Sequence, residues 1–177
     1  MSTKESNLTT ITAADLSGSD KVRVLDGGAS RNITVDDLLT YINSNVGTTD
    51  TWVPVITDGT NNATMTGASI GRYTKTGKHI SLLATVGVSS LGSVSGALLI
   101  SGLPFTSSAL TAQGVVTVGQ ATGLAITAST NVTGLVSTNA ATISLQLWDA
   151  TTGTTAMQHT ELSADGVLYI QASYYID

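Results

Sequence analysis

The fold is decided by one stretch of the chain, residues 71–86, which reads GRYTKTGKHISLLATV. Gly71–Lys75 and His79–Val86 have the alternating or continuous apolar pattern of strands, and Thr76-Gly77 separates them. Glycine adopts the positive φ angles that tight hairpin turns require, and Thr, Val and Ile favour strands. The stretch therefore predicts an antiparallel hairpin inside a β domain.

More strands are predicted on both sides of this hairpin. Trp52–Ile56 is apolar with an internal proline, which is typical of an edge strand, and Asp58–Asn62 is a turn cluster. Asp165-Gly166 predicts a last hairpin turn, between strands at 161–164 and 167–173. Further strands are expected at Ser95–Ser101, Gly114–Val118, Leu124–Ala128, Val132–Val136 and Thr142–Trp148. Short strands spaced by Gly and Ser turns predict a mainly β fold, a jelly-roll-like β-sandwich.

Two aromatic residues are expected to complete the core of this domain. Trp148 closes the alternating stretch Thr142–Leu147 and is predicted to be buried. Phe105 follows a strand that ends before Pro104, and we expect it to fill one end of the core.

The N-terminal part of the chain has a different pattern. Residues 1–19 are polar without periodicity and predict an extended or flexible arm. Two short strands, Lys21–Leu25 and Arg31–Ile33, are expected to pair across a turn at Asp26-Gly27-Gly28. Thr34 is a favourable N-cap for a helix that runs to about Asn45 or Gly47.

The helix offers one apolar face for attachment to another protein. Its members follow helical spacing and are Val35, Leu38, Leu39 and Ile42. A helix this short is marginal alone, so the face must be buried on the hairpin or on a partner. With Gly47–Thr51 read as a linker, the sequence predicts two domains. Residues 1–50 form an arm and hairpin-plus-helix attachment module, and residues 51–177 form a β-sandwich for oligomerisation.

Composition restricts the function. Only 11% of the residues are charged and the net charge is −5, which argues against nucleic acid as a partner. No segment is apolar enough to cross a membrane, the chain contains no cysteine, and its start does not have the pattern of a signal peptide. We therefore expect synthesis in a cytoplasm and no membrane partner.

The charges are also unevenly placed. All seven basic residues lie at or before Lys78, and the chain from His79 onward has four acids and no base: Asp149, Glu161, Asp165 and Asp177. A free monomeric surface usually has far more charge. A neutral coat of Ser and Thr is one interpretation, and coverage of the domain by copies of itself is the other.

The sequence contains little that could support catalysis. The histidines His79 and His159 have no local acid, and no nucleophile elbow or phosphate loop occurs. Asp58–Asn62 has too few acids for a calcium loop, and Asp165 is explained by its turn. We expect no enzyme activity and no catalytic, cofactor or metal site.

Two segments resemble the virion proteins of tailed bacteriophages. Residues 71–80 (GRYTKTGKHI) and 95–105 (SGALLISGLPF) are similar to a pattern in tail fibres, head fibres and capsid decoration proteins, and Trp52-Val53-Pro54 fits its first element. Leu8–Ile42 is similar to the N-terminal docking modules of such appendages. The resemblance implies homotrimers with β-sandwich heads, located in the virion and bound to the major capsid or tail protein.

Two roles remain open within this resemblance. The short chain favours a capsid decoration or head-fibre protein. The alternative is a tail fibre or receptor-binding protein that recognises host-surface glycan. Exposed aromatic residues would favour the alternative, and Tyr169, Tyr174 and Tyr175 form the one available cluster.

Overall fold

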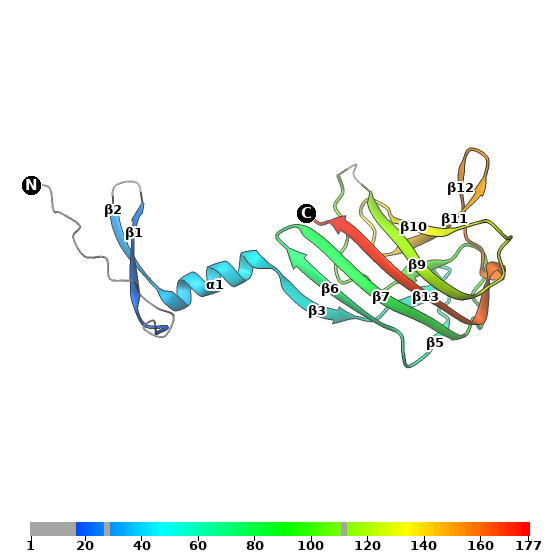
Figure 1. Cartoon of the computed structure of the whole chain (residues 1–177), viewed down its shortest axis with the longest axis horizontal. Coiled ribbons are helices and arrows are strands. Elements are labelled where there is room, and N and C mark those ends of the chain that lie inside the picture. Colours follow the sequence, from blue (N-terminus) through cyan, green and yellow to red (C-terminus); the bar gives the residue numbers. More distant parts are fainter. Residues whose placement is uncertain (1–16, 27–28, 111–112) are drawn as a thin grey trace, which may run out of the picture. The chain divides into compact units, whose positions relative to one another are not determined.

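The computed structural model describes residues 17–26, 29–110 and 113–177. The chain divides into two compact units, Met1–Val46 and Gly47–Asp177 (Figure 1). Within the described residues, no helix is long and apolar enough to span a membrane.

The N-terminal unit is a β-hairpin followed by a helix. Strands β1 (Lys21–Asp26) and β2 (Ala29–Thr34) pair antiparallel, and helix α1 (Val35–Val46) follows directly. The predicted strands and helix are confirmed. The predicted turn at Gly27-Gly28 and the arm at residues 1–16 lie outside the described residues.

Helix α1 begins where its sequence predicts. The hydroxyl of Thr34 accepts a hydrogen bond of 3.0 Å from the backbone N–H of Asp37 and donates one of 2.6 Å to its carboxylate. These bonds hold the pKa of Asp37 below its usual value. The backbone N–H groups of Val35 and Asp36 have no acceptor within the helix. They donate to the carbonyls of Asp20 and Gly18, respectively. The segment before the hairpin therefore completes the capping of the first helical turn.

The second unit consists of one large antiparallel sheet with a short 3-10 turn, η2 (His159–Glu161). Its strands are β3 (Thr48–Trp52), β4 (Val55–Thr57), β5 (Thr64–Met65), β6 (Ile70–Thr76), β7 (His79–Ser90), β8 (Leu99–Ser101), β9 (Gly114–Leu124), β10 (Val132–Val136), β11 (Ile143–Ala150), β12 (Gly153–Ala156) and β13 (Leu162–Tyr175). Their main order is β3-β6-β7-β13-β9-β10-β11-β8-β4, with β12 added to β11 and β5 to β7.

The sheet curls because its two edge strands are consecutive in the chain. Only Val53 and Pro54 separate β3 from β4, yet β3 pairs with β6 and β4 pairs with β8 at the opposite end. Proline has no N–H to donate, so it stands where the chain leaves one edge and joins the other. The mainly β class is confirmed, and the two faces of the expected sandwich belong to one curled sheet (Figure 1). The single edge strand predicted at Trp52–Ile56 is wrong, because Trp52 ends β3 and Val55 begins β4 at the opposite edge.

The concave side of the sheet holds the core. On β7 and β13 every second side chain points inward, and Ile80, Leu82, Ala84 and Val86 pair across strands with Tyr174, Ala172, Ile170 and Leu168. All eight are buried. The predicted hairpin of residues 71–86 forms one half of this arrangement, because β6 and β7 reverse at Gly77 with a φ of 58°.

Phe105 is partly buried at the edge of this core. Its ring meets the ring of Tyr73 edge to face, with the centroids 5.5 Å apart, and the ammonium group of Lys75 lies 5.0 Å from its centroid.

Three further local predictions are wrong, and the strand predicted at Ser95–Ser101 is shorter, since β8 covers only Leu99–Ser101. The expected linker 47–51 is mostly strand β3, which pairs with β6 from Thr48 to Trp52. Asp165-Gly166 does not reverse the chain, because β13 continues through it and the register against β9 shifts there. The Asp-Gly pair therefore marks a bulge and not a hairpin. Leu124–Ala128 is not a strand of its own, since β9 extends to Leu124 and a turn follows.

Candidate functional site: the outer face of the curled sheet

The convex face of the sheet is formed by the side chains that alternate with the core. The register places Arg72, Leu83, Gln171, Thr117 and Thr133 in one row across β6, β7, β13, β9 and β10. Ile70, Thr85 and Tyr169 make a second row beside it. This face combines apolar and polar side chains, with Arg72 as the one charged member of these rows.

An apolar patch lies at one end of this face, formed by Ile70, Leu83 and Tyr169. Their side chains are 51%, 59% and 46% exposed, and they surround a shallow hollow of about 430 Å³. Arg72 lines the same hollow, and its guanidinium makes no ion pair or hydrogen bond within the described part of the chain. Large adjacent apolar side chains on a soluble surface mark a contact surface more often than a free one.

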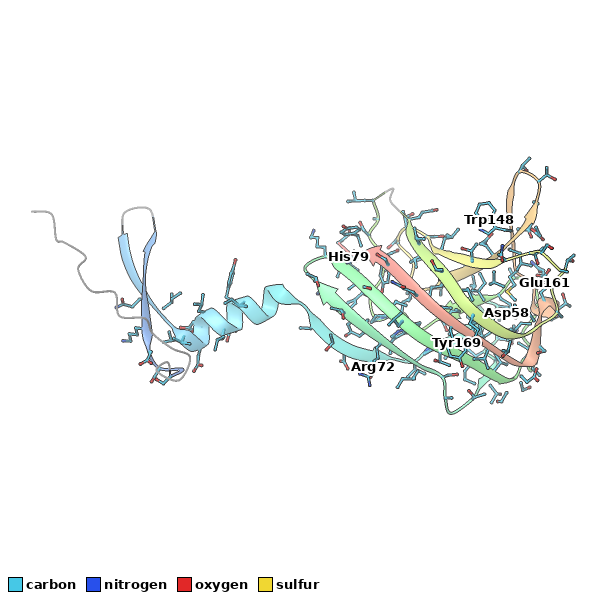
Figure 2. All side chains as sticks on the ribbon, in the orientation of Figure 1. Asp58, Arg72, His79, Trp148, Glu161 and Tyr169 are labelled. Carbon is cyan, nitrogen blue, oxygen red and sulfur yellow. The ribbon has the colours of Figure 1, made fainter. Side chains whose placement is uncertain are left out.

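A second hollow lies beside the first on this face and shares Thr117 and Gly119 with it. This Trp148 groove has a volume of about 480 Å³ and is lined by β9, the loop after it, β10 and β11. Its polar walls are Thr117, Gln120, Thr130, Asn131 and Thr133. Figure 2 places Trp148 near the β11–β12 hairpin, well separated from Arg72.

The prediction that Trp148 is a core residue is wrong, because its side chain is 58% exposed. Ile143, Leu145 and Leu147 are the inward residues of β11, so the strand period of two directs residue 148 outward. The alternation that suggested burial places the indole on the convex face.

The tyrosine cluster near the C-terminus divides between core and surface. Tyr174 is buried and its hydroxyl donates to the carbonyl of Phe105 at 3.1 Å, and burial raises its pKa to about 12. Tyr169 and Tyr175 point the other way and are exposed. Two of the three are therefore available to a partner.

The histidines are used in local contacts. His79 Nε2 lies 2.7 Å from Ser173 Oγ, and its ring packs against Tyr175 with centroids 5.1 Å apart. Within the described residues, no carboxylate is hydrogen-bonded to Nδ1 of His79, as a Ser-His-acid triad would need. His159 Nδ1 accepts the backbone N–H of Gly96. No group of three His, Cys, Asp or Glu side chains suited to a metal ion occurs in the described part.

Asp58 has a structural role. Its carboxylate accepts hydrogen bonds from the backbone N–H groups of Thr60 and Asn61, from the amide side chain of Asn61, and from the N–H of Ser95. These donors hold the pKa of Asp58 far below its usual value. The carboxylate thereby links two loops that are distant in sequence.

The four predicted attachment residues lie in the N-terminal unit and not in the β unit. Leu39 and Ile42 are 48% and 41% exposed, whereas Val35 and Leu38 are half-buried. The apolar stripe of α1 is thus only partly covered within the chain. Its role in attachment stays a prediction.

Sequence reasoning missed both the apolar patch and the Trp148 groove. The period of two identifies the outward residues of each strand, but register decides which of them meet across strands.

Comparison with known proteins adds a likeness of fold. No model of a known protein family matches the sequence, and no curated protein is significantly similar to it. Among solved structures, the crystal structure of the Dettilon tailspike protein is similar, with a TM-score of 0.67 and 20% sequence identity. The match covers 75% of this chain and 24% of that chain, so this chain spans about a quarter of the tailspike's length.

Proposed function

We propose that this chain is a non-enzymatic structural protein of a tailed-bacteriophage particle, in which the N-terminal unit, Met1–Val46, attaches the β unit to the capsid or tail. The observation that carries the proposal is the β unit itself, whose fold is similar to part of a tailspike protein. The sequence pattern at residues 71–105 independently resembles phage virion proteins, which supports the same class. Within it, we favour a homotrimeric capsid decoration or head-fibre protein.

The partly open stripe of α1 supports the attachment role. Leu39 and Ile42 remain exposed although the helix is well capped. The hairpin does not cover them, and burial of two such side chains on a partner would stabilise the complex by about 1.5–3 kcal/mol each at most. A capsid or tail protein is the partner that fits a module of this kind.

The apolar patch supports self-association. Leu83 and Tyr169 stand beside Arg72 on a face without acids in the register rows described above. Copies of the chain can meet on this face without burying carboxylates, and the contact must leave the guanidinium of Arg72 in water or pair it with an acceptor of the neighbouring copy.

The attachment role is tested with full-length protein and particles assembled without it. The double variant Leu39→Asp with Ile42→Asp places charge on the exposed part of the apolar face of α1. The matched control is Thr40→Asp, which lies on a different face of the same helix. We expect the double variant to remain folded but to fail to co-sediment with particles, while the control binds normally. Normal binding by the double variant would show that attachment belongs elsewhere.

A second candidate function is recognition of host-surface glycan by a tail-fibre or receptor-binding protein. The exposed indole of Trp148 in a polar groove favours it. The two functions are distinguished by removing the protein: a decoration protein leaves adsorption to host cells intact, and a receptor-binding protein abolishes it.

A further inference from the structure

The Trp148 groove combines an exposed indole with polar side chains and with a floor of apolar ones, Val118, Ala121, Leu124, Ile126 and Val132. Trp148 stands on β11, and its backbone N–H donates to the carbonyl of Asn131 at 2.9 Å, while its neighbour Leu147 is anchored in the core. The loop after β9 is closed by Thr130, whose hydroxyl donates to the carbonyl of Thr127. The indole is therefore held by paired strands, while Ile126, Thr130 and Asn131 of the lining come from the loop between β9 and β10.

The polar walls of the groove have capacity for hydrogen bonds. In the described part of the chain, no hydrogen bond uses the carboxamides of Gln120 and Asn131 or the hydroxyl of Thr117. Two carboxamides and a hydroxyl provide both donors and acceptors. By contrast, Thr133 already donates to the carbonyl of Val116 at 3.0 Å and contributes less.

The lining contains no charged side chain. A phosphate, sulfate or carboxylate ligand would find no cation there, and the net charge of −5 opposes anions further. Asp149, the next residue on β11, accepts from the hydroxyl of Thr155. The ligand that fits must be neutral, rich in hydroxyl groups, and apolar on one face.

We propose that the Trp148 groove binds a neutral saccharide, with a sugar ring stacked on the indole and its hydroxyls bonded to Gln120, Asn131 and Thr117. Carbohydrate rings have an apolar face of C–H groups and a rim of hydroxyls, which matches this combination. A concave site that combines apolar side chains with a few well-placed polar groups is the usual form of a small-ligand site. The proposal rests on the second candidate function above, and it names the site and the ligand class for it.

A second copy of the chain is a less suitable occupant. The aliphatic side chains of the groove, such as Leu124 and Ile126, are partly buried against the core, whereas Ile70 and Leu83 of the neighbouring apolar patch are more than half exposed. The occupant is nevertheless decided by experiment, because Trp148→Ala would also weaken a contact between copies.

The test uses the full-length chain on an immobilised panel of oligosaccharides. One set contains neutral hexose and N-acetylhexosamine oligomers, and the other contains sialylated and phosphorylated oligomers. We expect binding to members of the neutral set, weakened about tenfold or more by Trp148→Ala and less by Gln120→Ala, as for an aromatic anchor and a peripheral contact. The control Tyr175→Ala, an exposed aromatic that does not line the groove, should bind as the wild type does.

Four outcomes would overturn the proposal: no binding to any neutral oligomer, binding confined to the anionic set, binding unaffected by Trp148→Ala, or loss of the oligomer in that variant. The last outcome would assign the groove to a second copy. Particle attachment is measured separately with the α1 variants. A chain that binds particles but no saccharide therefore refutes this inference and leaves the structural role intact.

Discussion

The indole of Trp52 packs against the bare backbone of Gly71, its direct cross-strand partner between β3 and β6. Trp52 is buried, and a Cβ atom at residue 71 would overlap its ring. The glycine is needed for space, because its φ angle is not in the left-handed region. This contact fixes the edge strand β3 to the sheet.

Gly71→Ala should therefore destabilise the β unit by about 1–3 kcal/mol, the usual cost of overpacking a filled core. The reason is that either the indole or strand β3 must move to admit the methyl group. Gly67→Ala is the matched control, since nothing lies within 4 Å of a Cβ at that residue. Urea denaturation measures both, and equal midpoints for the two variants would show that Trp52 can shift without cost.

Trp148→Ala should change stability little, although it removes a large aromatic side chain. The ring is 58% exposed, so little buried area is lost. Leu147→Ala, one residue earlier, should cost about 2–5 kcal/mol because Leu147 is buried on the inward face. Thermal melts of the two variants side by side check this, and a larger loss for Trp148→Ala would mean that the indole is covered in solution.

These adjacent residues illustrate how far the sequence predicts the fold. Alternation over residues 143–147 predicts the strand and its inward face, and the hairpin at Gly77 follows from local turn chemistry. Asp165-Gly166 has the same local signal as a hairpin, but β9 pairs with β13 on both sides of it, at Leu162 and at Val167, so the pair forms a bulge. Local pattern predicts the elements, whereas pairing between distant strands decides which patterns are turns.

The candidate site could be predicted only in part for the same reason. The strand period of two predicts which aromatic residues are exposed. On β13 it directs Tyr169 and Tyr175 outward and Tyr174 inward. The Trp148 groove combines β9, β10 and β11 with an intervening loop, and the apolar patch combines β6, β7 and β13. The periodicity of a single segment does not show which residues of other strands lie beside it.

Asp58→Asn should destabilise the β unit at neutral pH, because the carboxylate accepts from both its own turn and Ser95. The pKa of Asp58 is lowered in the folded chain, so its contribution is present above the ordinary carboxyl pKa of about 4 and is lost as the pH falls below it. The difference in unfolding free energy between wild type and variant should therefore shrink under acid conditions. Asp149→Asn, whose carboxylate meets the Thr155 hydroxyl alone, is the control. A difference that is independent of pH would contradict the role given to the charge.

Tyr174→Phe should cost about 1 kcal/mol, the net value of the hydrogen bond from its hydroxyl to the carbonyl of Phe105. The raised pKa of Tyr174, about 12, also predicts behaviour in alkali. Because the folded chain holds the proton more tightly, this stabilisation is complete below about pH 10 and is lost as the pH rises toward 12. Unfolding at high pH, followed by circular dichroism, should be less steep for the Phe variant. The same profile for both proteins would argue that Tyr174 is hydrated.

The apolar patch gives the last prediction, that the chain self-associates through Leu83 and its neighbours. Leu83→Lys should convert the expected trimer to monomers, because it places an ammonium group in the contact and directly opposite Arg72 across β6 and β7. Asp is a poorer choice at this position, since it would face Arg72 within the same chain and become neutralised. Leu110→Lys is the control, because Leu110 is 73% exposed and does not line the patch. Light scattering at micromolar concentration should report trimers for the wild type and the control, and monomers for Leu83→Lys. A monomeric wild type would refute self-association itself, while a trimeric Leu83→Lys variant would move the contact to another face of the sheet.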